Sequence, residues 1–339
     1  MLKDWPPIAF YLPTALWPKD LPLPEDSAAT AHWRGFGLGI YAWTVQTALR
    51  LQRLGVPCQL TAALPEDGLV FFHSNAARVS PVPATATRLP ICLKAESTPL
   101  ATAPVHIVQN PGEVGAHHYF IPHWPQPGLL PRDRSRADRF ETVAFFGHSN
   151  SLAPELQTEH WQRQLAQLGL AWQPAISHNR WSEAAALHDR WHDYRQVDAV
   201  IAVRSFDRQR YPSKPATKLY NAWLAEVPAV LGVESAYRAT GHSGVDYLEV
   251  ASFDALIKAL RQLKHSAQLR RTLVANGRRQ VQRYQPEQIE QRWCQFIESV
   301  ALPIYERWRT DPVWRHRQQI RARWHSYQTR ACRRLSSHA

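Results

Sequence analysis

Apolar positions in the first third of the chain fall into short runs separated by turn-forming residues. The runs lie at 8–12, 58–61, 69–72, 91–94, 105–109 and 119–122. Runs of this length bounded by turn formers predict strands. Between the first two runs, the stretch 39–55 is apolar on most sides and ends at Gly55, which predicts a helix closed by a glycine cap.

A regular alternation of apolar runs and helical periods begins at residue 142. Strands are expected at 142–147, 170–173, 198–203, 228–232 and 246–250, and helices at 155–168, 181–195, 216–226 and 252–263. This alternation predicts parallel strands covered by helices on both faces. The stretch 123–141 is rich in proline and charge and has no apolar period, which is typical of a linker.

The predicted fold class is therefore α/β, with two Rossmann-like doubly wound domains facing a central cleft and a C-terminal helical tail. A chain of 339 residues is long enough for two cores. We expect an N-terminal domain over 1–135, a second domain over 140–302 and a tail over 303–339. Binding sites belong at the carboxyl ends of the strands, where loops and helix N-termini converge.

The net positive charge of the chain predicts an anionic partner. The chain has 40 Lys and Arg against 28 Asp and Glu, which suits nucleotide phosphates, nucleic acid or an acidic membrane surface. Its four cysteines include no CxxC pair, and no run approaches 18 apolar residues. With no leader pattern in the first residues, we expect a cytoplasmic protein, soluble or peripheral at the inner face of the membrane.

Much of the positive charge lies in the stretch 303–335. Beyond Leu302 the only acids are Glu306 and Asp311, against nine arginines. Two interpretations of this helical tail stay open: a helix on an anionic membrane surface, or a helix that packs back on the protein with solvated arginines. The apolar positions that recur at spacings of three, four or seven are Val313, Ile320, Trp324, Tyr327, Ala331 and Leu335.

Three stretches have the residue types that bind phosphate. In the first, Gly35, Gly37 and Gly39 open the first helix, where free N–H groups favour a negative charge. Their GxGxG spacing is a weak fingerprint, and a turn without a ligand explains it too.

The second and strongest stretch follows the strand at 198–203. It precedes a helix and combines hydroxyl groups with cations, which together match a diphosphate. A solvated basic face is the alternative. The residues are Arg204, Ser213, Lys214, Thr217 and Lys218. In the third stretch, His148, Ser149 and Asn150 form a polar loop after the strand that Gly147 ends, either beside the same site or as simple turn and capping residues.

The second half of the chain, over residues 142–297, resembles the donor-binding domain of GT-B fold glycosyltransferases of the group 1 type. The run "KLYNAWLAEVPAVLG" corresponds to the family's helix and following strand with a near-constant proline, here Pro228. The stretch "VDYLEVASFDALIKALRQL" resembles the late strand and helix of that domain. The Gly35 to Gly39 loop similarly resembles the family's first glycine-rich loop.

The resemblance implies a role in holding the donor's diphosphate and ribose for Arg204, Lys218 and Asn221. Where the family often has two glutamates eight residues apart, this chain has Ser213 and Asn221. No DxD motif occurs, so cations and helix dipoles are expected to neutralise the leaving group without a metal. No cofactor is expected beyond the nucleotide-sugar co-substrate.

An inverting transfer would need a base near the acceptor hydroxyl. His73 is the first candidate and Glu96 the second, because each follows a predicted strand; a lone histidine is also often structural. His117, His118 and His123 lack a recognised zinc spacing.

The sequence therefore favours a glycosyltransferase that acts on a glycan or lipid-linked acceptor. A non-catalytic protein that binds nucleotide sugars or polyanions is the alternative, because the glutamate pair is absent. Nucleic-acid binding is disfavoured, since no stacking-sheet motif or zinc-finger spacing is present.

Overall fold

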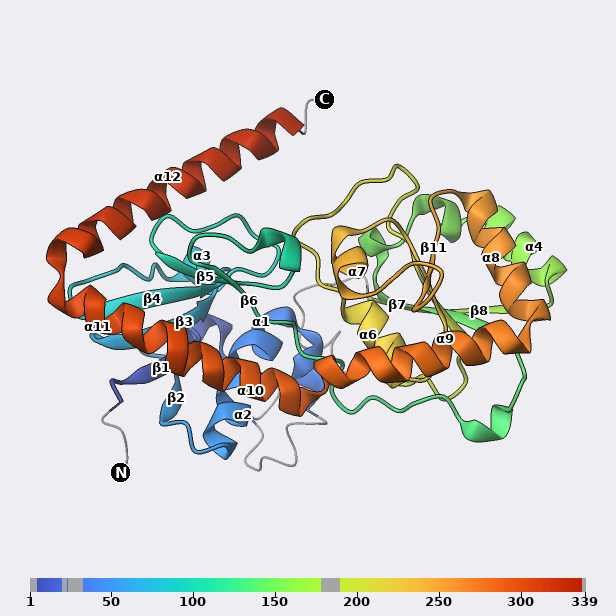
Figure 1. Ribbon diagram of the computed structural model, residues 1–339, viewed down its shortest axis with the longest axis horizontal. Coiled ribbons are helices and arrows are strands. Elements are labelled where there is room, and N and C mark those ends of the chain that lie inside the picture. Colours follow the sequence, from blue (N-terminus) through green and yellow to red (C-terminus); the bar gives the residue numbers. More distant parts are fainter. Residues whose placement is uncertain (1–4, 20–22, 24–32, 178–189, 337–339) are drawn as a thin grey trace. The chain divides into compact units, whose positions relative to one another are not determined.

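The computed structural model describes residues 5–19, 23, 33–177 and 190–336 (Figure 1). Within these ranges the chain divides into two compact units. The first contains residues 39–122 and 289–336 with the N-terminal segment, and the second contains 123–288 together with 34–38. The ranges expected from the sequence ended the two domains at 135 and 302 instead.

The first unit is built on a parallel six-stranded sheet in the order β2-β1-β3-β4-β5-β6. All six predicted runs form strands, with bounds that differ by at most a few residues. They are β1 (Ile8–Tyr11), β2 (Cys58–Thr61), β3 (Gly68–His73), β4 (Arg88–Leu93), β5 (Val105–Val108) and β6 (His118–Phe120).

One helical run crosses from β1 to β2, as predicted. It begins as α1 (Gly39–Tyr41), passes through a π-helical turn, η4 (Ala42–Gln46), and ends as α2 (Thr47–Arg53). Gly55 has a φ of +79°, the left-handed conformation expected of a glycine that closes a helix.

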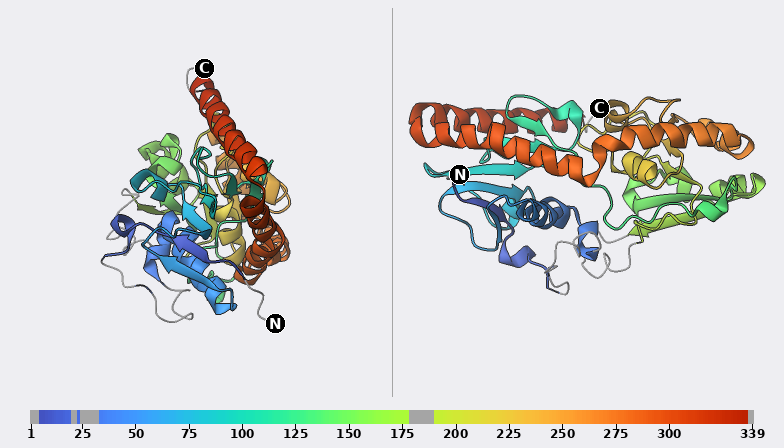
Figure 2. Two further views of the ribbon diagram at one scale, coloured as in Figure 1. Left: turned by 90° about the vertical axis from the view of Figure 1, so that its left-hand side faces the viewer. Right: turned by 60° about the horizontal axis from the view of Figure 1, so that its bottom comes forward.

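The C-terminal helices belong to this first unit and lie beside its sheet (Figures 1 and 2). Trp293 is fully buried and stands edge-on to Phe10, Trp43 and Phe71 at ring separations of 5.9–6.3 Å. Since Phe10 and Phe71 are on neighbouring strands, the indole joins the last part of the chain to the middle of the sheet. The helices are α10 (Pro286–Phe296), α11 (Leu302–Thr310) and α12 (Pro312–Ser336).

A buried ion pair adds to this attachment. The Nη1 atom of Arg50 lies 2.8 Å and the Nη2 atom of Arg53 2.6 Å from the Glu290 carboxylate, whose side chain is only 4% exposed. Further along, the His325 ring of α12 lies 4.7 Å from the His118 ring of β6. Helices at the end of the chain thus complete a unit whose strands come from its beginning.

The second unit is a parallel five-stranded sheet in the order β11-β10-β9-β7-β8. Every strand predicted after residue 142 is present. They are β7 (Thr142–His148), β8 (Ala171–Ser177), β9 (Ala199–Ala202), β10 (Ala229–Leu231) and β11 (Leu248–Glu249).

Helices cover both faces of this sheet, because successive strand residues point to opposite sides. Phe145 packs on one face with Trp161 of α4 (Glu159–Gln167) and with α8 (Phe253–His265). Phe146 packs on the other face with α6 (Thr217–Leu224). Helix α9 (Ala267–Gln280) packs against α6 at Gly277, where a β-carbon would collide with an indole ring of α6.

The helix expected at 181–195 was predicted wrongly over 190–195, the part of it that the structure describes. Residues 181–189 lie outside the described residues, and 190–195 form turns. Backbone bonds join Leu130 N to His192 O at 2.7 Å and Tyr194 N to Leu130 O at 2.9 Å. These bonds to the linker take the place of helical ones.

Both units share one strand order, 2-1-3-4-5 in local numbering, with a sixth strand in the first. Doubly wound sheets bind ligands where the strand order reverses, outside the carboxyl ends of the strands. The order reverses between β1 and β3 in the first unit and between β7 and β9 in the second. The expected pair of Rossmann-like α/β units is confirmed.

Candidate functional site

The carboxyl ends of β7 and β9 bring two of the predicted loops together. The amide of Ala153, in the loop after β7, donates to the carbonyl of Val203 after β9 at 2.8 Å. His148 ends β7, and Ser149 and Asn150 begin the first loop. The switch point of the second sheet is therefore bordered by the residues that the sequence singled out.

Lys218 reaches back over the end of β7 from the first turn of α6. A β-carbon at Gly147 would stand 3.3 Å from Cε and 3.4 Å from Nζ of the lysine, and Gly147 has a φ of +151°. The Nζ atom lies 5.6 Å from the Phe145 ring centre, within the range of a cation–π interaction. A glycine thus makes room for an ammonium group at the switch point.

Arg204 forms a buried ion pair with a residue that the sequence analysis missed. Its Nε lies 3.0 Å from Oε1 of Glu234, and the two side chains are 8% and 1% exposed. Glu234 lies three residues beyond β10. A carboxylate just after a strand, in "VLGVES", was the available signal, since that position faces the carboxyl edge of the sheet.

The loop after Arg204 has an unusual backbone. Arg208 and Tyr211 have φ values of +61° and +46°, a conformation that non-glycine residues rarely adopt and that gathers at functional sites. Ser205 Oγ contacts the hydroxyl of Tyr211 at 2.6 Å and also bonds Asp207. The Arg204 guanidinium lies 5.8 Å from the Tyr211 ring centre, so this loop is held against the cation.

Ser213, Lys214 and Thr217 continue from that loop into α6. The Lys214 amide donates to Tyr211 O at 3.0 Å, which closes a turn. Thr217 begins the helix and is half-buried. The amides at this helix start are the ones that an α-helix leaves without intrahelical partners.

Asn221 lies within α6, and its side chain contributes to the packing of the linker. Its Oδ1 accepts from the amide of Gln126 at 2.9 Å, and the side chain is 7% exposed. The hydroxyl of the preceding residue, Tyr220, donates to His123 O at 2.7 Å. The carbonyl oxygen of Asn221 is thus already occupied by the linker.

The predicted glycine loop lies partly in each unit. Gly37 belongs with the second unit and Gly39 with the first. A β-carbon at Gly39 would meet nothing within 4 Å. Local packing therefore does not require a glycine at that position.

The two candidate bases follow neighbouring strands of the first sheet. His73 ends β3, is 4% exposed, and its Nδ1 accepts from the Asn75 amide at 3.1 Å. A neutral ring in this arrangement has its proton on Nε2. Glu96 lies exposed in the turn after β4. Beside it, buried Lys94 pairs with Glu113 at 2.7 Å.

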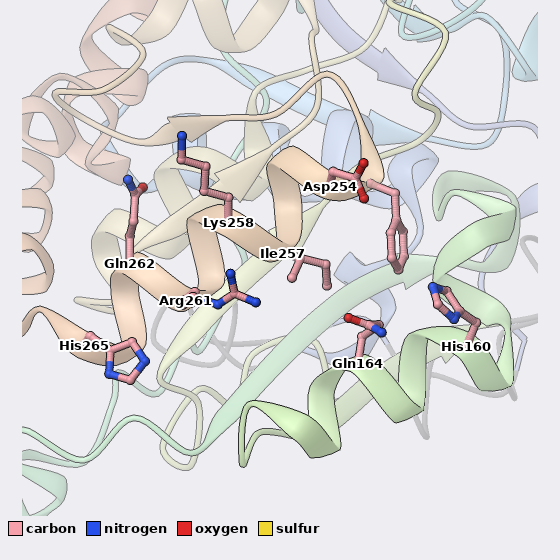
Figure 3. Close-up of a pocket in the computed structure, with 9 residues that line it drawn as sticks. His160, Gln164, Asp254, Ile257, Lys258, Arg261, Gln262 and His265 are labelled. Atoms are coloured by element: carbon pink, nitrogen blue, oxygen red, sulfur yellow. The ribbon is translucent and has the colours of Figure 1, made fainter.

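A separate cavity of about 810 Å³ lies between α4 and α8 and contains none of the predicted site residues (Figure 3). His160 and Gln164 of α4 face residues of α8 across it. Both helices cover one face of the sheet, so this groove is on the outside of the second unit.

Metal ligands were also sought among the described residues. In this part of the chain, no three His, Cys, Asp or Glu side chains are grouped so that they could hold a metal ion.

No family model matches the sequence, and no curated protein matches it. Solved structures that resemble the chain are GT-B glycosyltransferases. Anabaena HepE in complex with UDP-glucose is 12% identical, with a TM-score of 0.49 and coverage of 87% of this chain and 100% of that one. AviGT4, a glycosyltransferase involved in avilamycin A biosynthesis, is 14% identical, with a TM-score of 0.44 and coverage of 90% and 98%. TarM is 9% identical, with a TM-score of 0.46 over 74% of this chain, which spans 57% of TarM.

Proposed function

We propose that the chain is a glycosyltransferase that moves a sugar from a nucleoside diphosphate donor to a hydroxyl of a glycan or lipid-linked acceptor, without a metal. The observation that carries this proposal is the Lys218 ammonium group over Gly147 at the switch point of the second sheet. In doubly wound sheets this edge is where nucleotides bind.

Several groups of the second unit suit a departing diphosphate. Lys214, Lys218 and the amides at the start of α6 offer positive charge and donors, which stabilise a developing anion in a preorganised way. The guanidinium of Arg204 is fixed by its ion pair with Glu234. The Glu234 carboxylate is an acceptor suited to hydroxyl groups of a sugar or ribose.

His73 and Glu96 are retained as the proposed bases, and the acceptor is assigned to the first unit. Because Nδ1 of His73 accepts from a backbone amide, the proton of the neutral ring is on Nε2. For Nε2 to act as a general base, that proton would have to move to Nδ1. Glu96 has an exposed carboxylate that needs no such rearrangement. If the acceptor reaches both, Glu96 is the base that acts without a change of tautomer.

Nucleotide binding tests the proposal directly. A thermal-shift panel of nucleoside diphosphates and their sugars, starting with UDP and UDP-glucose, is expected to give at least one ligand that stabilises the fold. At about 100 times its dissociation constant, a specific ligand adds roughly 2.7 kcal/mol. The shift should persist in EDTA, because the proposed charges come from the protein.

Three outcomes separate the possibilities. If no nucleotide raises the melting temperature, the proposed donor site is wrong, and if EDTA abolishes the shift, metal independence is wrong. Binding without release of nucleoside diphosphate across a panel of glycan and lipid-linked acceptors would favour the non-catalytic alternative.

We also propose that α12 places the protein on an anionic membrane surface at the cytoplasmic face. Four of its large apolar side chains are exposed, and no described helix is both long and apolar enough to cross a membrane. The face that packs on the first unit is polar instead: Gln318 and Ser326 are 7% and 2% exposed. The outward residues are Val313, Ile320, Trp324 and Tyr327, at 62%, 52%, 61% and 68% exposure.

Arginines border this apolar stripe on both sides. At 100° per residue, Arg317 and Arg321 lie along one edge and Arg323 and Arg330 along the other. Guanidinium groups beside an outward tryptophan suit anionic headgroups above an acyl boundary. Among the described residues, Cys58, Cys92 and Cys294 are in no disulfide, which fits a reducing compartment.

Removing part of the stripe should release the protein from anionic vesicles. Ile320→Ser with Trp324→Ser is expected to weaken binding to vesicles that contain phosphatidylserine by about tenfold or more, because burying each such side chain contributes about 1.5–3 kcal/mol. Vesicle co-sedimentation measures this. Leu54→Ser with Val79→Ser removes two exposed apolar residues elsewhere in the same unit and should bind as the wild type does. Equal binding by all three proteins, or no preference for anionic lipid, would refute the membrane role.

A further inference from the structure

A second concentration of positive charge lies at the opposite edge of the five-stranded sheet. A cavity of about 470 Å³ is bordered there by Asp198, just before β9, and Pro228, just before β10. The linker and helix α9 form its other walls. The cavity is therefore at the amino ends of the strands, whereas the proposed donor site is at their carboxyl ends.

Arginines outnumber carboxylates in the lining of this cavity. Its carboxylates are Asp138, Asp198 and Glu226. The arginines come from the linker and from α9, and they are Arg132, Arg134, Arg139, Arg270, Arg271 and Arg278. Six guanidinium groups and three carboxylates leave the lining with an excess of three positive charges.

The carboxylates are already committed to half of these arginines. Asp198 accepts from Arg132 at 2.9 Å, and its other oxygen is taken by Arg136 beside the cavity at 2.6 Å. Glu226 forms a bidentate pair with Arg278 at 2.6 and 2.9 Å. Asp138 lies 3.3 Å from Arg271.

The remaining three arginines have no carboxylate partner within the described ranges. Arg139 donates to the carbonyls of Arg136 and Ser135, and Arg270 to those of Leu263 and Asp138. Arg134 is exposed at the mouth. Burial lowers the pKa of Arg270, and the neighbouring Arg132 and Arg271 lower it further, against the opposing effect of Asp138 and Asp198. The positive charges of these arginines therefore repel one another, and a bound anion would reduce that repulsion.

We infer that this arginine cavity binds a small anion with two or more phosphate groups. Cavities of about 300–1,000 Å³ hold small ligands, and the planar guanidinium fork matches phosphate oxygens. The linker arginines and the α9 arginines approach such a ligand from two sides. This site is separate from the donor site, so a phosphorylated effector and a nucleotide sugar can bind the second unit together.

Inorganic pyrophosphate is the probe, titrated calorimetrically into the full chain with Lys218→Ala, a background in which the proposed donor site is weakened. Adding Arg134→Gln and Arg271→Gln is expected to weaken pyrophosphate binding by at least about tenfold, since hydrogen bonds to charged groups contribute about 1.5–3 kcal/mol each. Both side chains are exposed, so the fold should tolerate the change. Arg163→Gln with Arg261→Gln, which removes the same charge from α4 and α8, is the matched control.

The inference holds if the cavity variant loses affinity and the control keeps it. It is overturned if pyrophosphate does not bind the Lys218→Ala protein, or if both double variants lose the same affinity, which would indicate net charge alone. UDP binding by the Arg134→Gln, Arg271→Gln protein with Lys218 intact should equal that of the wild type. If no nucleoside diphosphate or nucleotide sugar of the panel binds the wild type, the proposed function is refuted while this cavity site stays in place.

Discussion

Lys218→Ala is expected to weaken nucleoside diphosphate binding by about 10- to 100-fold and to slow sugar transfer by at least as much. The ammonium group lies over the backbone of Gly147 at the sheet's switch point. Hydrogen bonds from a cation to an anion contribute about 1.5–3 kcal/mol, and every 1.4 kcal/mol corresponds to tenfold in affinity. Calorimetric titration with UDP and an assay of diphosphate release would measure the two effects.

The matched control is Lys258→Ala, which removes a lysine of α8 that lines the cavity between α4 and α8. It carries the same charge in the same unit and should leave both measurements unchanged. The Lys218→Ala protein should also unfold at nearly the wild-type temperature, because the lysine side chain is only partly buried. If Lys218→Ala binds nucleoside diphosphate with wild-type affinity, the lysine is not part of the donor site.

The largest effect on stability is expected from Asp198→Ala, at about 3–5 kcal/mol for the second unit. The carboxylate is 1% exposed and accepts from Arg132, Arg136 and the amides of Glu141 and Thr142 at 2.6–2.9 Å. Removing one partner of a buried ion pair leaves the other charge uncompensated, which costs about this much.

The ionised Asp198 carboxylate also makes the stability of the second unit depend on pH. Burial alone would raise the pKa of Asp198, but the Arg136 guanidinium and the two amides outweigh it, and the pKa is lowered overall. A carboxyl whose pKa is lower in the folded state contributes stability above its unfolded pKa of about 3.9, and this contribution is lost as the pH falls through the folded value. Asp198→Asn should therefore be less stable than the wild type at pH 7 and should approach it below about pH 4.

Hydrogen exchange in β7 and β9 as a function of denaturant measures the stability of this unit, with exposed Asp254→Asn as the control. A loss of unfolding free energy below about 0.5 kcal/mol in Asp198→Ala would contradict the expectation. So would a stability of Asp198→Asn that falls with pH as the wild type's does.

Much of the strand arrangement could be predicted because it is determined by local patterns. Each apolar run between turn formers became a strand, and the alternation with helical periods gave parallel pairing. The proximity of the loop after β7 to α6 also followed, since carboxyl ends of parallel strands meet at one edge. The stretch 190–195 could not be predicted as turns, because its backbone bonds to Leu130 join residues far apart in sequence.

The site chemistry was harder to predict for the same reason. Glu234 pairs with Arg204 across 30 residues of chain, and no periodicity signals such a contact. Asn221 was assigned to the donor, but its carbonyl oxygen holds the amide of Gln126. The roles in donor binding and catalysis stay predictions, since they depend on ligands.

The tail shows a different division between sequence and structure. The apolar spacing of α12 was visible in the sequence, and its two interpretations were a surface helix and a helix packed on the protein. The structure combines elements of both: polar Gln318 and Ser326 pack inward while the apolar stripe that includes Trp324 stays exposed. A helical period alone cannot say which face the protein will use.

The composition of the first unit has a consequence for how the chain matures on the ribosome. Its strands are translated before Glu290 and Trp293, which complete its core and follow the end of β6 at Phe120 by 170 and 173 residues. Domains fold as units while synthesis proceeds at about 5–20 residues per second. The side chains of Phe10 and Phe71 should therefore lack their packing against Trp293 while most of the second unit is translated. We therefore expect the second unit to fold before the first, although the strands of the first unit are translated earlier.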